Sequence, residues 1–192
     1  MSGVEHPLYA VSRIILIVVL RSWSQLGLAT FIPFLYQAQL KSDPAYVATL
    51  LFFFLGSGTV GTVLGGPLAD RFGHRRLLFF STALQIPLIF LFLRSSGWMV
   101  FASAALLGGA IVSTFSVTIV MAQELFPRRM ATASGAIAGF AIGTGGVGVT
   151  LIGAVADRFG VPVATNLINV LPAIGAVLAL LLPLPWKSSS SR

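Results

Sequence analysis

Residues 66–73 read Gly66-Pro67-Leu68-Ala69-Asp70-Arg71-Phe72-Gly73, and residues 153–160 read Gly153-Ala154-Val155-Ala156-Asp157-Arg158-Phe159-Gly160. Both follow the pattern G-x-x-A-D-R-F-G, 87 residues apart, and each closes a long apolar stretch. Three apolar stretches lie between equivalent points of the two copies. Because three is odd, the copies must face opposite sides of a membrane that the chain spans. The pattern favours an inverted three-plus-three repeat, although a generic way of ending a helix would also produce so short a match.

The composition points to a membrane protein. Of the 192 residues, 56% are hydrophobic and 9% are charged, and the mean hydropathy is +0.95. A soluble domain carries roughly 25% charged residues, so this chain could not cover a soluble fold with polar groups. The net charge of +7 is better explained by cationic loops at one membrane face than by a nucleic-acid partner. The expected environment is a lipid bilayer.

Six apolar stretches are long enough to cross it, at residues 14–37, 46–68, 77–93, 98–121, 131–156 and 162–184. They must be helical, because unpaired backbone groups are costly in hydrocarbon and the apolar/polar alternation of barrel strands is missing. We therefore expect an all-α polytopic membrane protein. Its six-helix domain would cover residues 14–184, with repeat one at about 14–93 and repeat two at about 98–184. Cytoplasmic segments 1–13 and 185–192 would flank it.

The distribution of Lys and Arg sets the orientation. With the N-terminus inside, the inner face would carry Arg13, Arg71, Arg75, Arg76, Arg128, Arg129, Lys187 and Arg192. The outer face would carry only Lys41, Arg94 and Arg158. The positive-inside rule then predicts a multi-pass protein of the plasma (cytoplasmic) membrane with both termini in the cytoplasm.

Several motifs resemble one transporter family. The spacing Gly66-x-x-x-Asp70-Arg71-x-Gly73-His74-Arg75-Arg76 resembles the signature loop of the major facilitator superfamily, departing at His74, where Arg is commoner. Three further stretches resemble the C-terminal half of its fosmidomycin-resistance branch: Leu20-Arg21-Ser22-Trp23 with Gln25, Gly27, Thr30-Phe31 and Pro33; Gln123-Glu124-Leu125-Phe126-Pro127; and Ala133-Ser134-Gly135. The resemblance covers nearly the whole chain but only half of the family's usual twelve helices. It implies half of a major facilitator fold.

The resemblance also implies a cytoplasmic gate. The gating motif would consist of Gly66, Asp70, Arg71, Gly73, Arg75 and Arg76, where the arginines offset a carboxylate at the unfavourable C-terminal end of a helix. The alternative is a positive-inside anchor with one solvated acid. Glu124, Arg128 and Arg129 form a second cytoplasmic cluster, which could pair with the motif or be a solvated loop. The repeat copy, Asp157-Arg158, could be a gate element or only a helix-ending turn.

Arg21 is the sharpest candidate for substrate contact. It lies inside the first span with Gln25 one turn further on, and an ionisable residue within a membrane is a functional hypothesis by default. It could bind an anionic group of a substrate, or it could snorkel to the cytoplasmic headgroups. All five acidic residues lie outside the span interiors. A proton-coupled transporter would therefore use Glu124 at the mouth or a carboxylate of a missing half; the remaining alternative is that this chain does not couple transport to protons.

These observations predict small-molecule transport, and the resemblance implies drug or metabolite efflux by alternating access. A second six-helix half, as another copy or a separate chain, would have to complete the cavity. Recurrent glycines in the second and fifth spans could form that interface or serve packing inside this half. The alternative function is a non-transporting membrane subunit or a truncated transporter fragment. The sequence shows no catalytic constellation, metal site or cofactor motif, so we expect no enzyme activity and no cofactor.

Overall fold

The computed structural model describes residues 7–39 and 43–182, which form long helices and no strand. The helices are α1 (Pro7–Pro33), α2 (Pro44–Phe72), α3 (His74–Arg94), α4 (Trp98–Leu125), α5 (Met130–Phe159) and α6 (Val161–Leu180). A π-helix, η1 (Phe34–Gln39), continues α1, and a 3-10 turn, η2 (Pro127–Arg129), precedes α5. Six described helices are long and apolar enough to cross a membrane, which confirms the predicted polytopic all-α fold.

The helices extend further into the polar segments than the hydropathy alone indicated. The expected break at residues 70–76 is helical except at Gly73, and α4 runs through Glu124 to Leu125. Charged side chains at a helix end remain hydrated, so they do not have to stop the helix. The first helix begins at Pro7, within the stretch expected to precede the first span, and the last ends at Leu180. The expected tail 185–192 and residues 1–6 lie outside the described residues.

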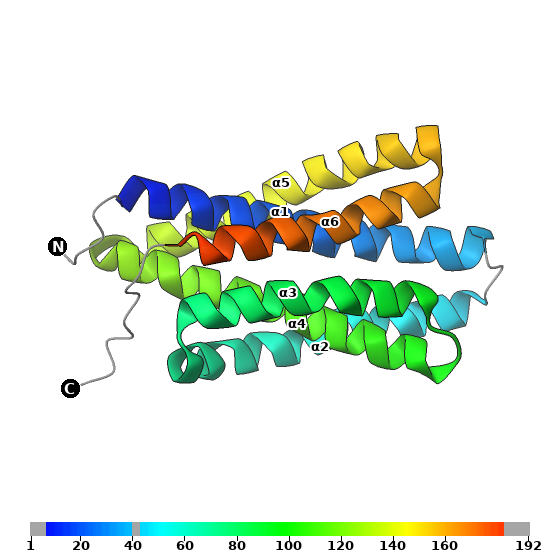
Figure 1. Ribbon diagram of the computed structural model, residues 1–192, viewed down its shortest axis with the longest axis horizontal. Helices are drawn as coiled ribbons and strands as arrows, with labels where there is room; N and C mark the ends of the chain where they lie inside the picture. Colours follow the sequence, from blue (N-terminus) through cyan, green and yellow to red (C-terminus); the bar gives the residue numbers. More distant parts are fainter. Residues whose placement is uncertain (1–6, 40–42, 183–192) are drawn as a thin grey trace.

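Gly73 and Gly160, the last glycines of the two octapeptides, lie at opposite ends of the bundle, and each gives its end a name (Figure 1). The Gly73 end carries the start of α1, the α2–α3 and α4–α5 connections and the end of α6. The Gly160 end carries η1, the start of α2 and the α3–α4 and α5–α6 connections. The two octapeptides thus lie at opposite ends, as an inverted repeat requires.

The packing of the helices follows the same symmetry. The repeat makes α1 equivalent to α4, α2 equivalent to α5 and α3 equivalent to α6. The contact between α2 and α4 therefore corresponds to the contact between α5 and α1. In the same way, the contact between α3 and α4 corresponds to that between α6 and α1. The α3–α6 contact maps onto itself. The exchange of partners confirms the predicted inverted three-plus-three repeat.

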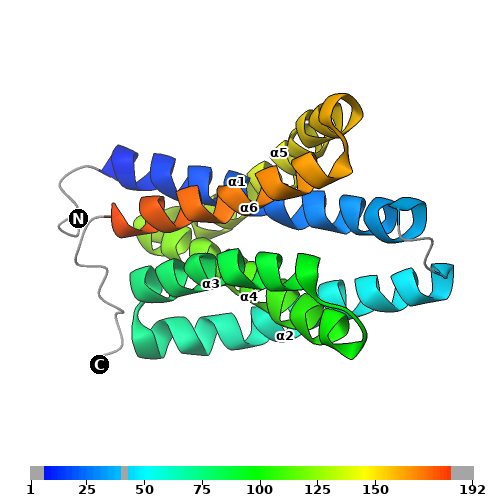
Figure 2. The ribbon, with the colours of Figure 1, turned by 45° about the vertical axis from the view of Figure 1, so that its right-hand side comes forward.

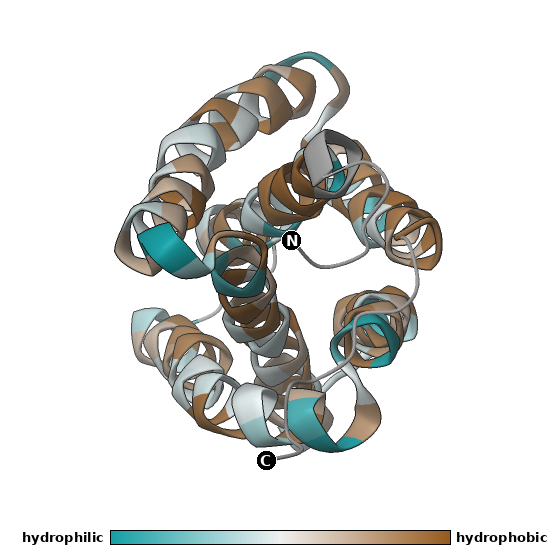
Figure 3. Ribbon diagram, turned by 90° about the vertical axis from the view of Figure 1, so that its left-hand side faces the viewer, coloured by the Kyte–Doolittle hydropathy of each residue, from teal (hydrophilic) through white to brown (hydrophobic). Residues whose placement is uncertain are grey.

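The core divides into two clusters, one toward each end. Phe54, Phe92 and Leu107 belong to the cluster toward the Gly160 end, and Ile14, Leu78 and Met121 to the other. Helices α1 and α4 are the most buried spans and α2 and α5 the most exposed. In two views α5 leans away from the α2–α3–α4 group toward the Gly160 end (Figures 1 and 2). Seen from the Gly73 end, hydrophobic residues dominate the helical surfaces (Figure 3).

Candidate substrate path and cytoplasmic gate

Arg21 is buried inside the six-helix unit. Its side chain is 7% exposed, Nη1 donates to Gln25 Oε1 at 2.9 Å and Nη2 donates to Ser22 Oγ at 3.1 Å. Its guanidinium carbon lies 4.7 Å from the ring centroid of Phe115 on α4. The bond to Gln25 runs one turn away from the start of α1, which is the direction opposite to snorkelling toward the Gly73 end. The structure therefore brings together Arg21 and Gln25, the two residues predicted for the substrate path.

The charge of Arg21 has no carboxylate beside it in the described part of the chain. Its Nε has no hydrogen-bond partner there, and its polar contacts are the neutral Gln25 and Ser22. Asp43, Asp70, Glu124 and Asp157 all lie at or near helix ends. An unpaired buried charge costs several kcal/mol, and the aromatic face offsets only about 2 kcal/mol of such a cost. The site is electrostatically suited to an anion.

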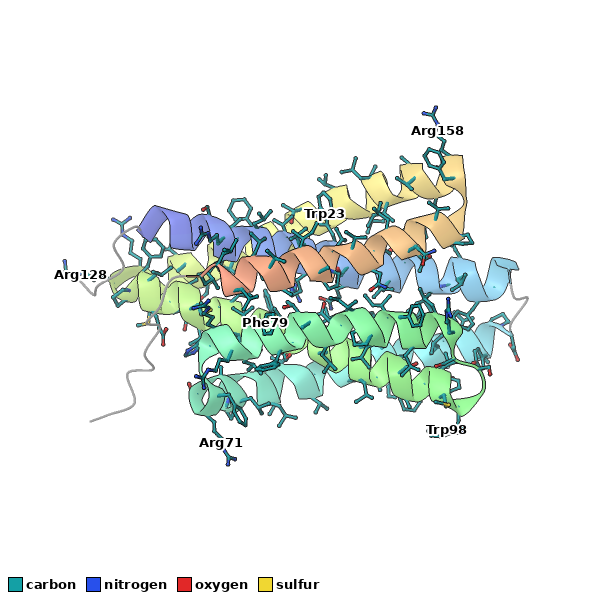
Figure 4. All side chains as sticks on the ribbon, viewed as in Figure 1. Trp23, Arg71, Phe79, Trp98, Arg128 and Arg158 are labelled. Atoms are coloured by element: carbon teal, nitrogen blue, oxygen red, sulfur yellow. The ribbon has the colours of Figure 1, made fainter. Side chains whose placement is uncertain are left out.

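The gating motif is arranged differently from the simple pairing of Asp70 with its neighbouring arginines. Asp70 is exposed in the last turn of α2, and no ion pair joins it to Arg71, Arg75 or Arg76 within residues 7–39 and 43–182. Arg71 stands over its neighbour, with the guanidinium carbon 5.7 Å from the Phe72 ring centroid, and points away from the bundle (Figure 4). Gly66 is in the helix and Gly73 makes the turn with φ 89°.

Arg75 instead reaches the C-terminal end of α6. Its Nε donates to the carbonyl oxygen of Ala179 at 3.3 Å, and its Nη2 donates to that of Leu180. Arg13 of α1 donates to the carbonyl oxygen of the next residue, Leu181. The last turn of α6 has no basic residue of its own, so two arginines from other helices complement the negative end of its dipole. The sequence did not predict this contact, because its acceptors are backbone carbonyl oxygens, which every residue type carries.

The residues predicted to form a second cytoplasmic cluster lie at the α4–α5 connection. Glu124 lies in the last turn of α4 and is partly buried, whereas Arg128 and Arg129 are exposed in η2. Arg128 points away from the helices (Figure 4). A hydrogen bond next to the cluster connects α4 to α5: Gln123 Nε2 donates to Ser134 Oγ at 2.7 Å.

The repeat copy at the opposite end reproduces the Asp70–Arg71 part of the gating motif. Asp157 and Arg158 are exposed in the last turn of α5, as Asp70 and Arg71 are in α2. The guanidinium carbon of Arg158 lies 5.8 Å from the Phe159 ring centroid and also points outward (Figure 4). The repeat therefore extends to the placement of side chains. It does not extend to Arg75, whose equivalent in repeat two is Pro162.

Glycines divide α2 and α5 into a packed face and an open face. A Cβ built at Gly58 or Gly61 would overlap Val112 or the carbonyl oxygen of Gly109 on α4. At Gly145 and Gly148, their repeat equivalents on α5, it would overlap Leu26 or Trp23 on α1. The open face has nothing within 4 Å of such a Cβ and contains Gly56 and Gly66 on α2 and Gly135, Gly139, Gly143, Gly146 and Gly153 on α5. Internal packing therefore accounts for only some of these glycines.

Comparisons with known proteins agree with the geometry. Residues 14–191 match the sequence profile of the Major Facilitator Superfamily. The chain is 38% identical over 152 residues to YfnC, an uncharacterized MFS-type transporter of Bacillus subtilis (strain 168), covering 79% of this chain and 36% of that protein. It is 28% identical over 174 residues to the fosmidomycin resistance protein of Escherichia coli (strain K12), covering 91% of this chain and 43% of that protein.

The chain thus spans less than half the length of these relatives. The stretch that matches the family profile contains most of α1, all of α2 to α6 and both copies of the repeat. With its fold, its repeat and its sequence profile in agreement, the chain is a multi-pass membrane protein that belongs to the major facilitator superfamily.

Proposed function

We propose that this chain is one six-helix half of a transporter that exports small anionic molecules by alternating access. The observation that carries the proposal is Arg21, a buried cation within a membrane span whose hydrogen bonds go only to neutral groups. A residue with that burial and that missing counter-charge is suited to an anionic group of a substrate. The relative named a fosmidomycin resistance protein supports export of a drug or metabolite as the direction of transport.

The gating motif and the second cluster would close the path at the Gly73 end, which the charge distribution assigns to the cytoplasm. Asp70 and Arg71 are exposed there and free to pair across the mouth, beside Arg76, Arg128 and Arg129. Asp157 and Arg158 would play the corresponding part at the outer mouth. The termini would then be cytoplasmic, and residues 14–184 would form one half of the transport unit.

A second six-helix unit would cover the open faces of α2 and α5. Small residues spaced four apart allow close helix approach, as at Gly135, Gly139 and Gly143. The two halves of the fold are related by an axis along the membrane normal, so either a second copy or a separate chain could occupy this surface. We expect no catalytic activity from the chain.

The test is accumulation of fosmidomycin in cells that express the chain, compared with Arg21→Ala at equal membrane levels. Export predicts lower accumulation with the original chain and loss of that effect in Arg21→Ala. The matched control is Arg94→Ala, because Arg94 is exposed at the Gly160 end with its guanidinium carbon 4.2 Å from the ring centroid of Phe90. Equal accumulation with and without the chain, for this and other small anions, would instead identify a non-transporting subunit or fragment.

A further inference from the structure

The turn between α2 and α3 exposes two arginines. Arg71 lies in the last turn of α2 and Arg76 in the first turn of α3, on either side of Gly73. Both side chains are exposed, and neither is paired with a carboxylate within residues 7–39 and 43–182. Arg75, which lies between them in the sequence, is engaged at the end of α6. The turn therefore presents two guanidinium groups to the surroundings of the bundle.

The two arginines lie at the depth of lipid headgroups. Arg76 and Arg94 are both exposed, near the two ends of α3. The helix rises about 27 Å between them, which is close to the roughly 30 Å of a bilayer core. Because α2 ends where α3 begins, Arg71 lies at the same boundary as Arg76. Both guanidinium groups are therefore within reach of the phosphates of one leaflet.

Arg71 belongs to a flank of α2 that is suited to an acyl chain. Its guanidinium carbon lies 5.7 Å from the ring centroid of Phe72, and the side chain points away from the bundle (Figure 4). Leu64, about two turns earlier and so on the same face as Arg71, is 50% exposed, and Phe72 is 55% exposed. Gly66, on the face proposed for the second six-helix unit, is turned from Leu64 by about 200°. An acyl chain can therefore lie along this flank without entering that interface.

The repeat-equivalent turn between α5 and α6 lacks the second arginine. It keeps the acidic and basic pair as Asp157 and Arg158, but Val163 stands at the position of Arg76. The exposed charges of the α5–α6 turn therefore cancel, whereas Arg76 leaves the α2–α3 turn with a net positive charge. The two turns have the same backbone and differ in charge, so each serves as a control for the other.

We propose that the α2–α3 turn binds an anionic phospholipid, with the headgroup phosphate between Arg71 and Arg76 and an acyl chain along Phe72 and Leu64. Two guanidinium groups suit a phosphate that brings no cation of its own. A zwitterionic headgroup would place its cation beside the two arginines. The inference goes beyond the proposed transport, because it requires neither a substrate nor a second six-helix unit. Arg71 is also a member of the proposed gate, so the test measures lipid binding and not transport.

Quenching of a reporter tryptophan by lipids with brominated acyl chains measures the preference. The reporters are Leu64→Trp on α2 and Leu151→Trp, its repeat equivalent on α5, at side chains that are 50% and 52% exposed. The full chain is reconstituted in phosphatidylcholine vesicles that contain a rising fraction of brominated phosphatidylglycerol or, in parallel, of brominated phosphatidylcholine. The signal of the chain without a reporter is subtracted, since the chain has three tryptophans of its own.

We expect the Leu64→Trp reporter to favour phosphatidylglycerol over phosphatidylcholine roughly fivefold, the factor that one net charge at a membrane surface produces. The Leu151→Trp reporter should show no preference. Arg71→Gln combined with Arg76→Gln should abolish the preference at Leu64→Trp, whereas Arg158→Gln should leave it unchanged. If the double variant fails to insert, Arg76→Gln alone replaces it, because it gives the α2–α3 turn the charge of its repeat equivalent.

Three results would overturn the inference. Equal quenching of Leu64→Trp by the two lipids would show that the anionic headgroup is not recognised. An equal preference at both reporters would show a general attraction to the surface, and a preference that survives the loss of both arginines would place the site elsewhere. Any of these together with export of anions would leave the proposed function intact. A lipid preference without export would reject the proposed function and keep the lipid site.

Discussion

Gly73 and Gly160 adopt the same left-handed turn at opposite ends of the bundle. Their φ angles are both 89°, and the N–H of each donates at 2.8 Å to the carbonyl oxygen four residues earlier, Ala69 or Ala156. The next helix begins directly after each glycine. Two tight reversals of this kind align α2 with α3 and α5 with α6 without a loop, so they fix the register within each repeat.

The first prediction concerns these turns. Gly73→Ala and Gly160→Ala should each lower the free energy of unfolding by about 1–3 kcal/mol, because a Cβ is strained at this φ. Gly66→Ala is the control, since Gly66 is helical with nothing near a new Cβ, and it should be neutral or slightly stabilising. Thermal unfolding in detergent measures the three variants. If Gly66→Ala and Gly73→Ala lowered the free energy of unfolding equally, the turn at Gly73 would not require glycine and the prediction would be wrong.

The second prediction separates the two glycine faces. Gly61→Ala should destabilise the six-helix unit by roughly 1–3 kcal/mol, because its Cβ meets the backbone of α4 at Gly109. Gly139→Leu on the open face of α5 should leave the unfolding temperature unchanged and weaken association with the second unit. Size-exclusion chromatography with light scattering reads out the association. If Gly61→Ala weakened association and Gly139→Leu did not, the interface would not lie on the open face, and the prediction would be wrong.

The third prediction concerns the clamp on α6. Arg75→Ala should increase amide hydrogen exchange in the last turns of α6 about tenfold, since it removes two charge-assisted contacts to the helix end. Arg13→Ala should act in the same direction. Arg76→Ala is the control, because Arg76 is exposed and donates to no α6 carbonyl in the described structure. Unchanged exchange in Arg75→Ala would show that the contacts do not hold α6.

The fourth prediction concerns the aromatic partner of Arg21. Phe115→Leu should raise the apparent Km for export of an anion by up to roughly tenfold, because the ring holds the guanidinium in place through a cation–π contact worth about 1–2 kcal/mol. Arg21→Lys should also impair export, since an ammonium cannot reproduce the planar arrangement between Gln25, Ser22 and the ring. Phe80→Leu, at a side chain 64% exposed, serves as the control. A change in Km with Phe80→Leu as large as that with Phe115→Leu would argue against a local role.

The sequence was sufficient for the topology because both of its signals are local. Hydropathy located each span, and the spacing of Gly73 and Gly160 required opposite ends. The contact of Arg75 with Ala179 and Leu180 could not be read in this way, because any helix end offers the same carbonyl oxygens.

The distinction between the two glycine faces also needed the structure. Gly58 and Gly56 are two residues apart in one apolar stretch, yet only Gly58 meets α4. Helical periodicity places them on different sides but does not say which side a neighbour covers. The burial of Arg21 depends in the same way on Phe115, which comes from another helix.

If this chain is one half of a twelve-helix transporter, it must assemble with a second six-helix unit. Native mass spectrometry of the chain, extracted gently from the membrane in which it is expressed, measures this assembly. We expect a complex of two six-helix units, either two copies or this chain with a different six-helix protein, and we expect Gly139→Leu to dissociate it. A stable lone monomer would contradict the proposal, because one half alone cannot enclose a path around Arg21.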